Sequence, residues 1–202
     1  MSDRSRDHVL RSLRAATAGM TPVALPERSF TGVRFADVEA QFAKSVAEVG
    51  GRCIFAEDAA LESTLLQLPA YAAAKRVLSR VPGLARANVE RAELRAPRET
   101  WNIDFCVLPG ELGVAENGAV WVVEAGFSHR AAWFLAEHMA LVVPARKLVH
   151  NMHEAYERIE LGSAGFATFV SGPSKTADIE QSLVIGAQGP RSCTVLVTRG
   201  PA

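Results

Sequence analysis

The run Met139-Ala-Leu-Val-Val143 is apolar at every position and lies between a charged segment and a proline. Four other short runs have a similar character: Asp104-Phe-Cys-Val-Leu108, Ala119-Val-Trp-Val-Val123, Ala167-Thr-Phe-Val170 and Thr194-Val-Leu-Val197. Runs this short and this apolar are typical of strands covered on both faces, as in a parallel or mixed sheet between layers of helices. They predict the sheet around which the domain is built.

Segments with helical periodicity alternate with these runs. Apolar residues recur every three or four positions in residues 35–49, and Gly50-Gly51 ends the pattern. A strand is expected at 52–56 and a helix through Leu61 and Leu66. Two more helices are expected, from Pro69 through Leu78 and from Pro144 to Leu161. Helices alternating with buried strands predict an α/β domain.

The N-terminal residues form a separate segment. Apolar residues recur at helical spacing between Asp3, which can cap a helix, and Gly19, which can end it. Proline and glycine interrupt residues 20–33 and favour an irregular connection there. We therefore divide the chain into residues 1–33, a helix and its connection, and residues 34–202, the main domain.

Composition excludes several classes of partner. Twenty-two basic residues balance 22 acidic ones, so no net field attracts nucleic acid or an anionic membrane. No stretch approaches the roughly 18 to 20 apolar residues that cross a bilayer, and the N-terminus lacks a secretory apolar region. Cys53, Cys106 and Cys193 are far apart and form no CxxC pair. We expect a cytoplasmic protein without a cofactor in this chain, and any electron carrier on another chain.

The segment from Ser171 to Arg191 is the most specific in the sequence. It is expected to turn at Gly172-Pro173 and to begin a short helix near Thr176, a geometry that offers free N–H groups to a phosphate or carboxylate. The side chains expected around this anion are Ser174, Lys175, Thr176, Asp178 and Arg191. The segment is not a P-loop, because Ser174 and Phe169 stand where glycines are needed. Ordinary surface ion pairs of Lys175, Asp178 and Arg191 are the alternative interpretation.

Glu116 is the candidate catalytic residue. It precedes Asn117-Gly118, a strong turn signal between two apolar runs, and is therefore expected at the end of a strand. A carboxylate there can act as a base, a nucleophile or a hydrogen-bond acceptor. The alternative is that Glu116 only accepts hydrogen bonds from turn amides.

No metal site is predicted. His150, His153, Glu154 and Glu157 have spacings that suit a divalent metal on one helix. They fall opposite the apolar stripe of the expected helix, however, which favours a solvated polar face.

The motifs together resemble a known family. Ser171-Gly-Pro-Ser-Lys-Thr-Ala-Asp-Ile-Glu180, with Gly186-Ala-Gln-Gly-Pro-Arg191, resembles the C-terminal signature of the LUD domain family in its lactate utilization protein C (LutC/YkgG) type. Supporting matches are Asp104-Phe-Cys-Val107, Gly113-Val-Ala-Glu-Asn-Gly118 and Glu137-His-Met-Ala-Leu-Val-Val143. The family usually has Thr or Ser after the motif glutamate, where this chain has Asn117.

The resemblance implies a fold and a role. The fold is a three-layer α/β/α domain with a mainly parallel sheet, similar to the NagB/RpiA/CoA transferase superfamily. The role is that of a subunit which, with two iron-sulfur partner proteins, converts L-lactate to pyruvate and binds a small carboxylate or other anion. Two alternatives stay open. One is a stand-alone CoA transferase or acyl hydrolase, because the Glu116-Asn-Gly118 triplet resembles the turn whose glutamate forms a thioester in family I CoA transferases; the other is a non-catalytic module that binds a carboxylate or phosphorylated sugar.

Overall fold

The computed structural model describes residues 3–21, 32–89, 96–124, 131–160, 165–177 and 183–200. Contacts within the chain group it into two compact units, residues 1–31 and 32–202. The first unit contains one described helix, α1 (Asp3–Thr17), and Gly19 follows it with a φ of 83°. The predicted N-terminal helix is thus confirmed. Most of the predicted connection lies outside the described residues, and the boundary at residue 33 stays a prediction.

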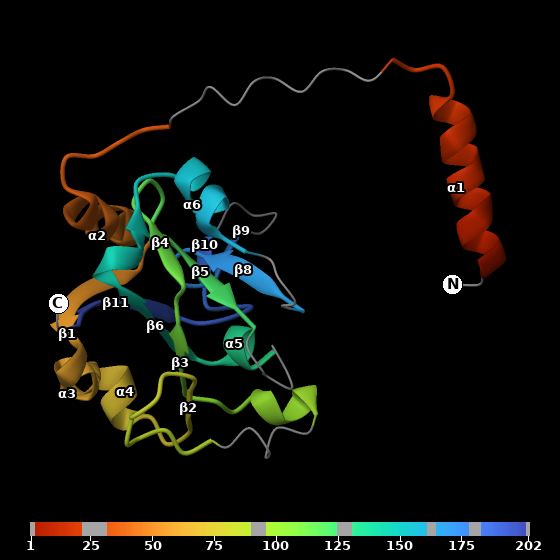
Figure 1. Ribbon diagram of the computed structural model, residues 1–202. Coiled ribbons are helices and arrows are strands. Elements are labelled where there is room, and N and C mark those ends of the chain that lie inside the picture. The colour runs from red at the N-terminus through yellow and green to blue at the C-terminus, as the bar shows by residue number, and fades with distance from the viewer. Residues whose placement is uncertain are drawn as a thin grey trace. The chain divides into compact units, whose positions relative to one another are not determined.

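A five-stranded parallel sheet forms the centre of the second unit (Figure 1). Its order is β1-β11-β6-β3-β2. The strands are β1 (Arg52–Glu57), β2 (Val77–Ser79), β3 (Phe105–Pro109), β6 (His138–Pro144) and β11 (Ser192–Arg199). Residues of β6 face two different cores in alternation, and its five central side chains are all buried. The apolar run of β6 therefore has the cause predicted from sequence, because both faces of the sheet are covered there. The predicted runs 119–123 and 167–170 belong to a different sheet.

Helices α3 (Leu61–Leu66) and α4 (Pro69–Ala73) cover one face of this sheet. Leu65 and Tyr71 are fully buried there, and the Tyr71 ring meets Phe105 edge-on at 5.1 Å between centroids. The expectation that the helix from Pro69 continues through Leu78 is wrong. The backbone N–H groups of Lys75 and Arg76 donate to the Asp104 carboxylate, so the chain leaves the helix and enters β2.

The other face of the central sheet packs against helix α2 (Val38–Glu48), helix α5 (Ala131–Leu135) and a second sheet (Figure 1). The second sheet has the order β7-β4-β5-β8. Its strands are β4 (Leu112–Val114), β5 (Ala119–Val123), β7 (Leu148–Val149) and β8 (Ala167–Val170). Val120 and Val122 of β5 face the core shared with α2, and Trp121 faces outward toward helix α6 (Met152–Arg158). The mostly parallel α/β fold is confirmed, and the second sheet is a feature that the sequence did not predict.

The single helix expected from Pro144 to Leu161 is wrong. The chain instead forms a 3-10 turn (Ala145–Lys147), strand β7 and then α6. Leu148 and Val149 pair in parallel with Gly113 and Val114, so they satisfy their backbone groups in the second sheet. Asn151 starts the true helix, because its side chain accepts a hydrogen bond from Glu154 N at 3.0 Å.

The remaining described elements are short. Two more 3-10 segments lie at Asp58–Ala60 and Pro97–Thr100, and strands β9 (Lys175–Ala177) and β10 (Leu183–Ile185) form a hairpin. No helix in the described ranges is both long and apolar enough to cross a bilayer.

The tight packing of the β4–β5 turn on α2 gives a first prediction. Gly118 has a φ of 66°, and a Cβ there would lie 2.7 Å from Val46 N. Gly83 has a similar φ of 81° but open space around it. Gly83→Ala should lower the free energy of unfolding by about 1–2 kcal/mol through backbone strain alone. Gly118→Ala should lower the free energy of unfolding by clearly more, about 3 kcal/mol or above, because backbone atoms of α2 must also move. Equal losses in denaturant unfolding would contradict this packing.

A second prediction concerns the buried thiol of Cys106. Burial raises its pKa well above the ordinary value of 9.0. Above pH 9 the unfolded chain loses this thiol proton while the folded protein keeps it, so the free energy of unfolding falls as the pH rises. Cys106→Ala should make that fall shallower by about 1.4 kcal/mol per pH unit. Val107→Ala, on the same strand and equally buried, should leave the slope unchanged in denaturant titrations at several pH values. If Cys106→Ala leaves the slope of unfolding free energy against pH unchanged, the pKa of the Cys106 thiol is not raised by burial.

Candidate functional site

The two bends singled out by sequence lie against each other. Ser171 Oγ donates a hydrogen bond to the backbone oxygen of Asn117 at 3.0 Å. Both bends also pack on the C-terminal half of α2: Gly118 lies against Ser45 and Val46, and Gly172 lies against the backbone oxygen of Val49. At Gly172 the φ of 72° and this close contact both require glycine. The end of α2 thus holds the two candidate segments together.

The expectation that a short helix begins near Thr176 is wrong for the described residues there. Lys175–Ala177 form β9, which pairs antiparallel with β10 in the register Thr176 to Val184. Ser174 is fixed from both sides, since its N–H donates to Pro190 O and its carbonyl oxygen accepts from Gly186 N, both at 2.9 Å. Within the described part of the turn, residues 171–177, there is thus no helix N-terminus to bind an anion.

A cavity of about 280 Å³ lies beside this turn, and we call it the Lys175 cavity. It is lined by Trp133, Phe134, Met139, Val170, Gly172, Pro173, Ser174, Lys175, Gln188, Gly189 and Pro190. Met139 is near the start of β6 and Pro190 precedes β11. The cavity therefore lies at the amino ends of central strands. Three of the predicted ligand-binding residues, Gly172, Ser174 and Lys175, share it.

The other predicted ligand-binding residues lie elsewhere. Thr176 is in β9 and does not line the cavity. Arg191 Nη1 lies 2.9 Å from Glu137 Oε1, with 67% of the arginine side chain exposed, which is the surface ion pair weighed as the alternative. Asp178 lies outside the described residues. The anion site as a whole stays a prediction.

Glu116 is exposed at the end of β4 and does not line the Lys175 cavity. Its Oε2 accepts a hydrogen bond from Met152 N at 2.9 Å, at the first residue of α6. Its own N–H donates to His150 O at 3.0 Å. In this conformation the carboxylate caps α6, and a catalytic role of Glu116 stays a prediction.

The histidines of the α6 region take part in structure. His150 Nδ1 accepts from Phe35 N at 3.1 Å, and His150 N donates to Glu154 at 3.1 Å. His138 Nδ1 lies 2.8 Å from Ser192 Oγ, across neighbouring strands of the central sheet. Within the described ranges, His, Cys, Asp and Glu form no group of three or more that could hold a metal.

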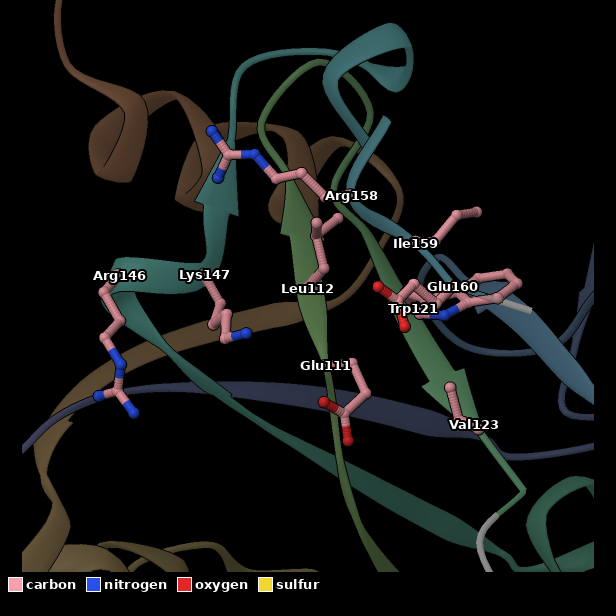
Figure 2. Close-up of a pocket in the computed structure, with 9 residues that line it drawn as sticks. All are labelled: Glu111, Leu112, Trp121, Val123, Arg146, Lys147, Arg158, Ile159 and Glu160. Atoms are coloured by element: carbon pink, nitrogen blue, oxygen red, sulfur yellow. The ribbon is translucent and has the colours of Figure 1, made fainter. Parts of the chain in front are cut away.

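One large cavity of the described residues was not predicted from the sequence. It measures about 600 Å³ and includes Glu111, Arg146 and Lys147 (Figure 2). A signal was present in the sequence, because Glu111 comes just after the apolar run ending at Leu108, and Arg146-Lys147 come just after the run ending at Val143. In parallel sheets, residues directly after strands gather at the edge where ligands bind.

The capping contact of Glu116 gives a third prediction. Glu116→Ala removes the acceptor of an otherwise unpaired helix N–H and should lower the free energy of unfolding by about 1 kcal/mol. Glu157→Ala, on an exposed position of the same helix, is the control and should change it by less than about 0.5 kcal/mol. Denaturant unfolding compares the two, and equal stability of both variants would show that Glu116 does not cap α6.

Comparisons with known proteins place this geometry in a family. The LUD domain family model matches residues 73–198, well over half of the chain. Lactate utilization protein C of Geobacillus kaustophilus is 32% identical over 122 residues, covering 57% of this chain and 48% of the relative. An uncharacterized protein of Neisseria meningitidis is 30% identical over 122 residues, covering 56% of this chain and 52% of the relative. The chain thus spans about half the length of these curated relatives.

A solved structure shows the same fold. The crystal structure of a DUF162 family protein from Deinococcus radiodurans aligns with a TM-score of 0.59 and 16% identity, covering 83% of this chain and all of that chain. Every residue that lines the Lys175 cavity, and Glu116 as well, falls within the range that the family model matches. From this match over residues 73–198 we conclude that the chain belongs to the LUD domain family.

Proposed function

We propose that this protein is a cytoplasmic subunit of a system that oxidises L-lactate to pyruvate. The observation that carries the proposal is the match to relatives named lactate utilization protein C at about 30% identity. The family model that also matches spans residues 73–198, which include every residue that lines the Lys175 cavity. The proposed substrate contact is between the lactate carboxylate and Lys175.

The chemistry of the Lys175 cavity suits a small monocarboxylate. Lys175 supplies one positive charge, and among the described residues no ion pair neutralises it. Ser174 and Gln188 supply polar groups for a hydroxyl, and Met139 and Pro173 supply apolar surface for a methyl group. One point charge beside apolar walls matches a carboxylate with a short apolar chain.

Oxidation of lactate releases two electrons and two protons, and we propose that iron-sulfur partner proteins take the electrons. A cluster is held by thiolates. Burial raises the pKa of Cys106 well above its ordinary value and that of Cys193 to about 12, so both thiols favour the protonated form. Cys53, half-buried in β1, has a pKa raised to about 11. The cysteines of this chain therefore suit packing better than cluster binding, and we assign this subunit a non-redox role.

The CoA transferase alternative is supported less well. It requires the Glu116 carboxylate as a nucleophile, and that carboxylate accepts a hydrogen bond from Met152 N outside the Lys175 cavity. A nucleophilic Glu116 would have to give up this contact.

Deletion and complementation in the organism that encodes the protein test the proposal. The deletion strain should grow slowly on L-lactate and normally on pyruvate, because only the oxidation step is lost. The wild-type gene and Lys75→Ala should restore growth, since Lys75 is exposed and lines no described cavity. Lys175→Ala should restore it poorly, because loss of one charge-assisted contact weakens binding about tenfold or more.

Affinity purification of the tagged wild-type protein from lactate-grown cells tests the partnership. Iron-sulfur proteins should co-purify in stoichiometric amounts. Unchanged growth of the deletion strain on lactate, together with purification of the chain alone, would contradict the proposed function.

A further inference from the structure

A second large cavity of the described residues is separate from the Lys175 cavity, and we call it the carboxyl-edge cavity. It measures about 600 Å³. It is lined by Glu111, Leu112, Trp121, Val123, Arg146, Lys147, Arg158, Ile159 and Glu160. None of these residues lines the Lys175 cavity. A ligand of the carboxyl-edge cavity would therefore contact none of the residues that line the Lys175 cavity.

The position of this cavity follows from the central sheet. Strands β3 and β6 are parallel neighbours, and their carboxyl ends lie side by side. Glu111 follows β3 after a single glycine, and Arg146 and Lys147 lie in the turn that follows β6. Ligands of open α/β sheets bind outside the carboxyl ends of strands. The carboxyl-edge cavity has this position, whereas the Lys175 cavity lies at the opposite edge.

Side chains of both charges line the cavity. Arg146, Lys147 and Arg158 are exposed, and among the described residues no ion pair or side-chain hydrogen bond involves them. Three cations that line one cavity, and that have no partner among the described residues, favour an anion with more than one negative charge. Glu111 and Glu160 add two carboxylates, which accept hydrogen bonds from hydroxyl or amino groups.

The floor of the cavity is apolar. Strands β4 and β5 pair beneath it and contribute Leu112, Trp121 and Val123 (Figure 2). Figure 2 shows Arg146 and Lys147 on the left of β4, and Ile159 and Glu160 on its right. A ligand that contacts both groups needs an extended body with apolar surface as well as charge. Lactate is too small to do this in a cavity of about 600 Å³.

We propose that the carboxyl-edge cavity binds an organic polyanion that also carries hydroxyl or amino donors, with the size and charge of a nucleoside diphosphate. Its phosphate groups contact Lys147 and Arg158, its hydroxyl groups contact the two carboxylates, and its ring lies on the apolar floor. This binding requires neither lactate nor the iron-sulfur partners.

Isothermal titration calorimetry of the full chain with ADP tests the proposal. One ADP should bind per chain, more weakly as salt is added, because the contacts are ionic. Lys147→Glu and Arg158→Glu should each weaken ADP binding at least about tenfold, since each variant replaces an attractive charge with a repulsive one. Both side chains are exposed, so the variants should keep the wild-type melting temperature.

Matched variants separate this site from other sources of binding. Lys75→Glu reverses an exposed charge that lines no described cavity, and Lys175→Ala alters only the Lys175 cavity; both should bind ADP as the wild type does. Inorganic pyrophosphate should bind more weakly than ADP, because it lacks the ring and hydroxyl groups. The absence of any ADP heat at millimolar concentration, unchanged binding in Lys147→Glu, or pyrophosphate binding as tight as ADP would overturn the proposal.

Discussion

The pairing of β6 with β11 at the middle of the central sheet is the constraint on which the rest of the structure depends. Leu141 pairs with Val195 and Val142 pairs with Leu196, and these side chains are buried on the two faces of the sheet. Backbone groups in such a position have no access to water and must bond to neighbouring strands. The two faces therefore need apolar covers, which α3 and α4 supply on one side and α2, α5 and the second sheet on the other.

Because both faces are covered, the polar chemistry of the domain gathers at the two ends of the strands. The amino ends hold the Lys175 cavity, beside the bends at Gly172 and Asn117 that pack on α2. The carboxyl ends hold the larger cavity with Lys147 and Arg158. One sheet thus supports two separate cavities of different size and charge, and the proposals assign a small carboxylate to the first and a larger polyanion to the second.

The sequence predicted the strands well because their signal is local. A run such as Met139–Val143 is too short and too apolar for a surface helix, and this holds in any context. The helices expected over residues 69–78 and 144–161 were wrong, because residues distant along the chain decide the structure there. The Asp104 carboxylate accepts hydrogen bonds from the backbone N–H groups of Lys75 and Arg76. In the second sheet, Gly113 and Val114 pair with Leu148 and Val149. No periodicity within residues 69–78 or 144–161 reveals partners that lie so far away along the chain.

For the candidate site too, the sequence predicted the grouping of residues that are adjacent along the chain but not of those that are distant. Gly172, Ser174 and Lys175 share a cavity because consecutive turn residues stay together whatever the fold. The position of Thr176 depends on the hairpin of β9 and β10, whose register the sequence did not reveal. Arg191 instead pairs with Glu137, which is distant along the chain. The carboxyl-edge cavity forms because β3 and β6 are neighbours in the sheet. The sequence of neither strand predicts which strand lies beside it.

Hydrogen–deuterium exchange of the free chain, resolved by residue, tests the central claim most directly. If the β6–β11 pair is the buried centre, the amides of Leu141 to Val143 and Val195 to Val197 should exchange slowest, and only through global unfolding. Amides of the β9–β10 hairpin, whose described side chains are mostly exposed or half-buried, should exchange faster through local opening. Slowest exchange in the hairpin, or exchange of β6 and β11 as fast as that of the hairpin, would contradict this account.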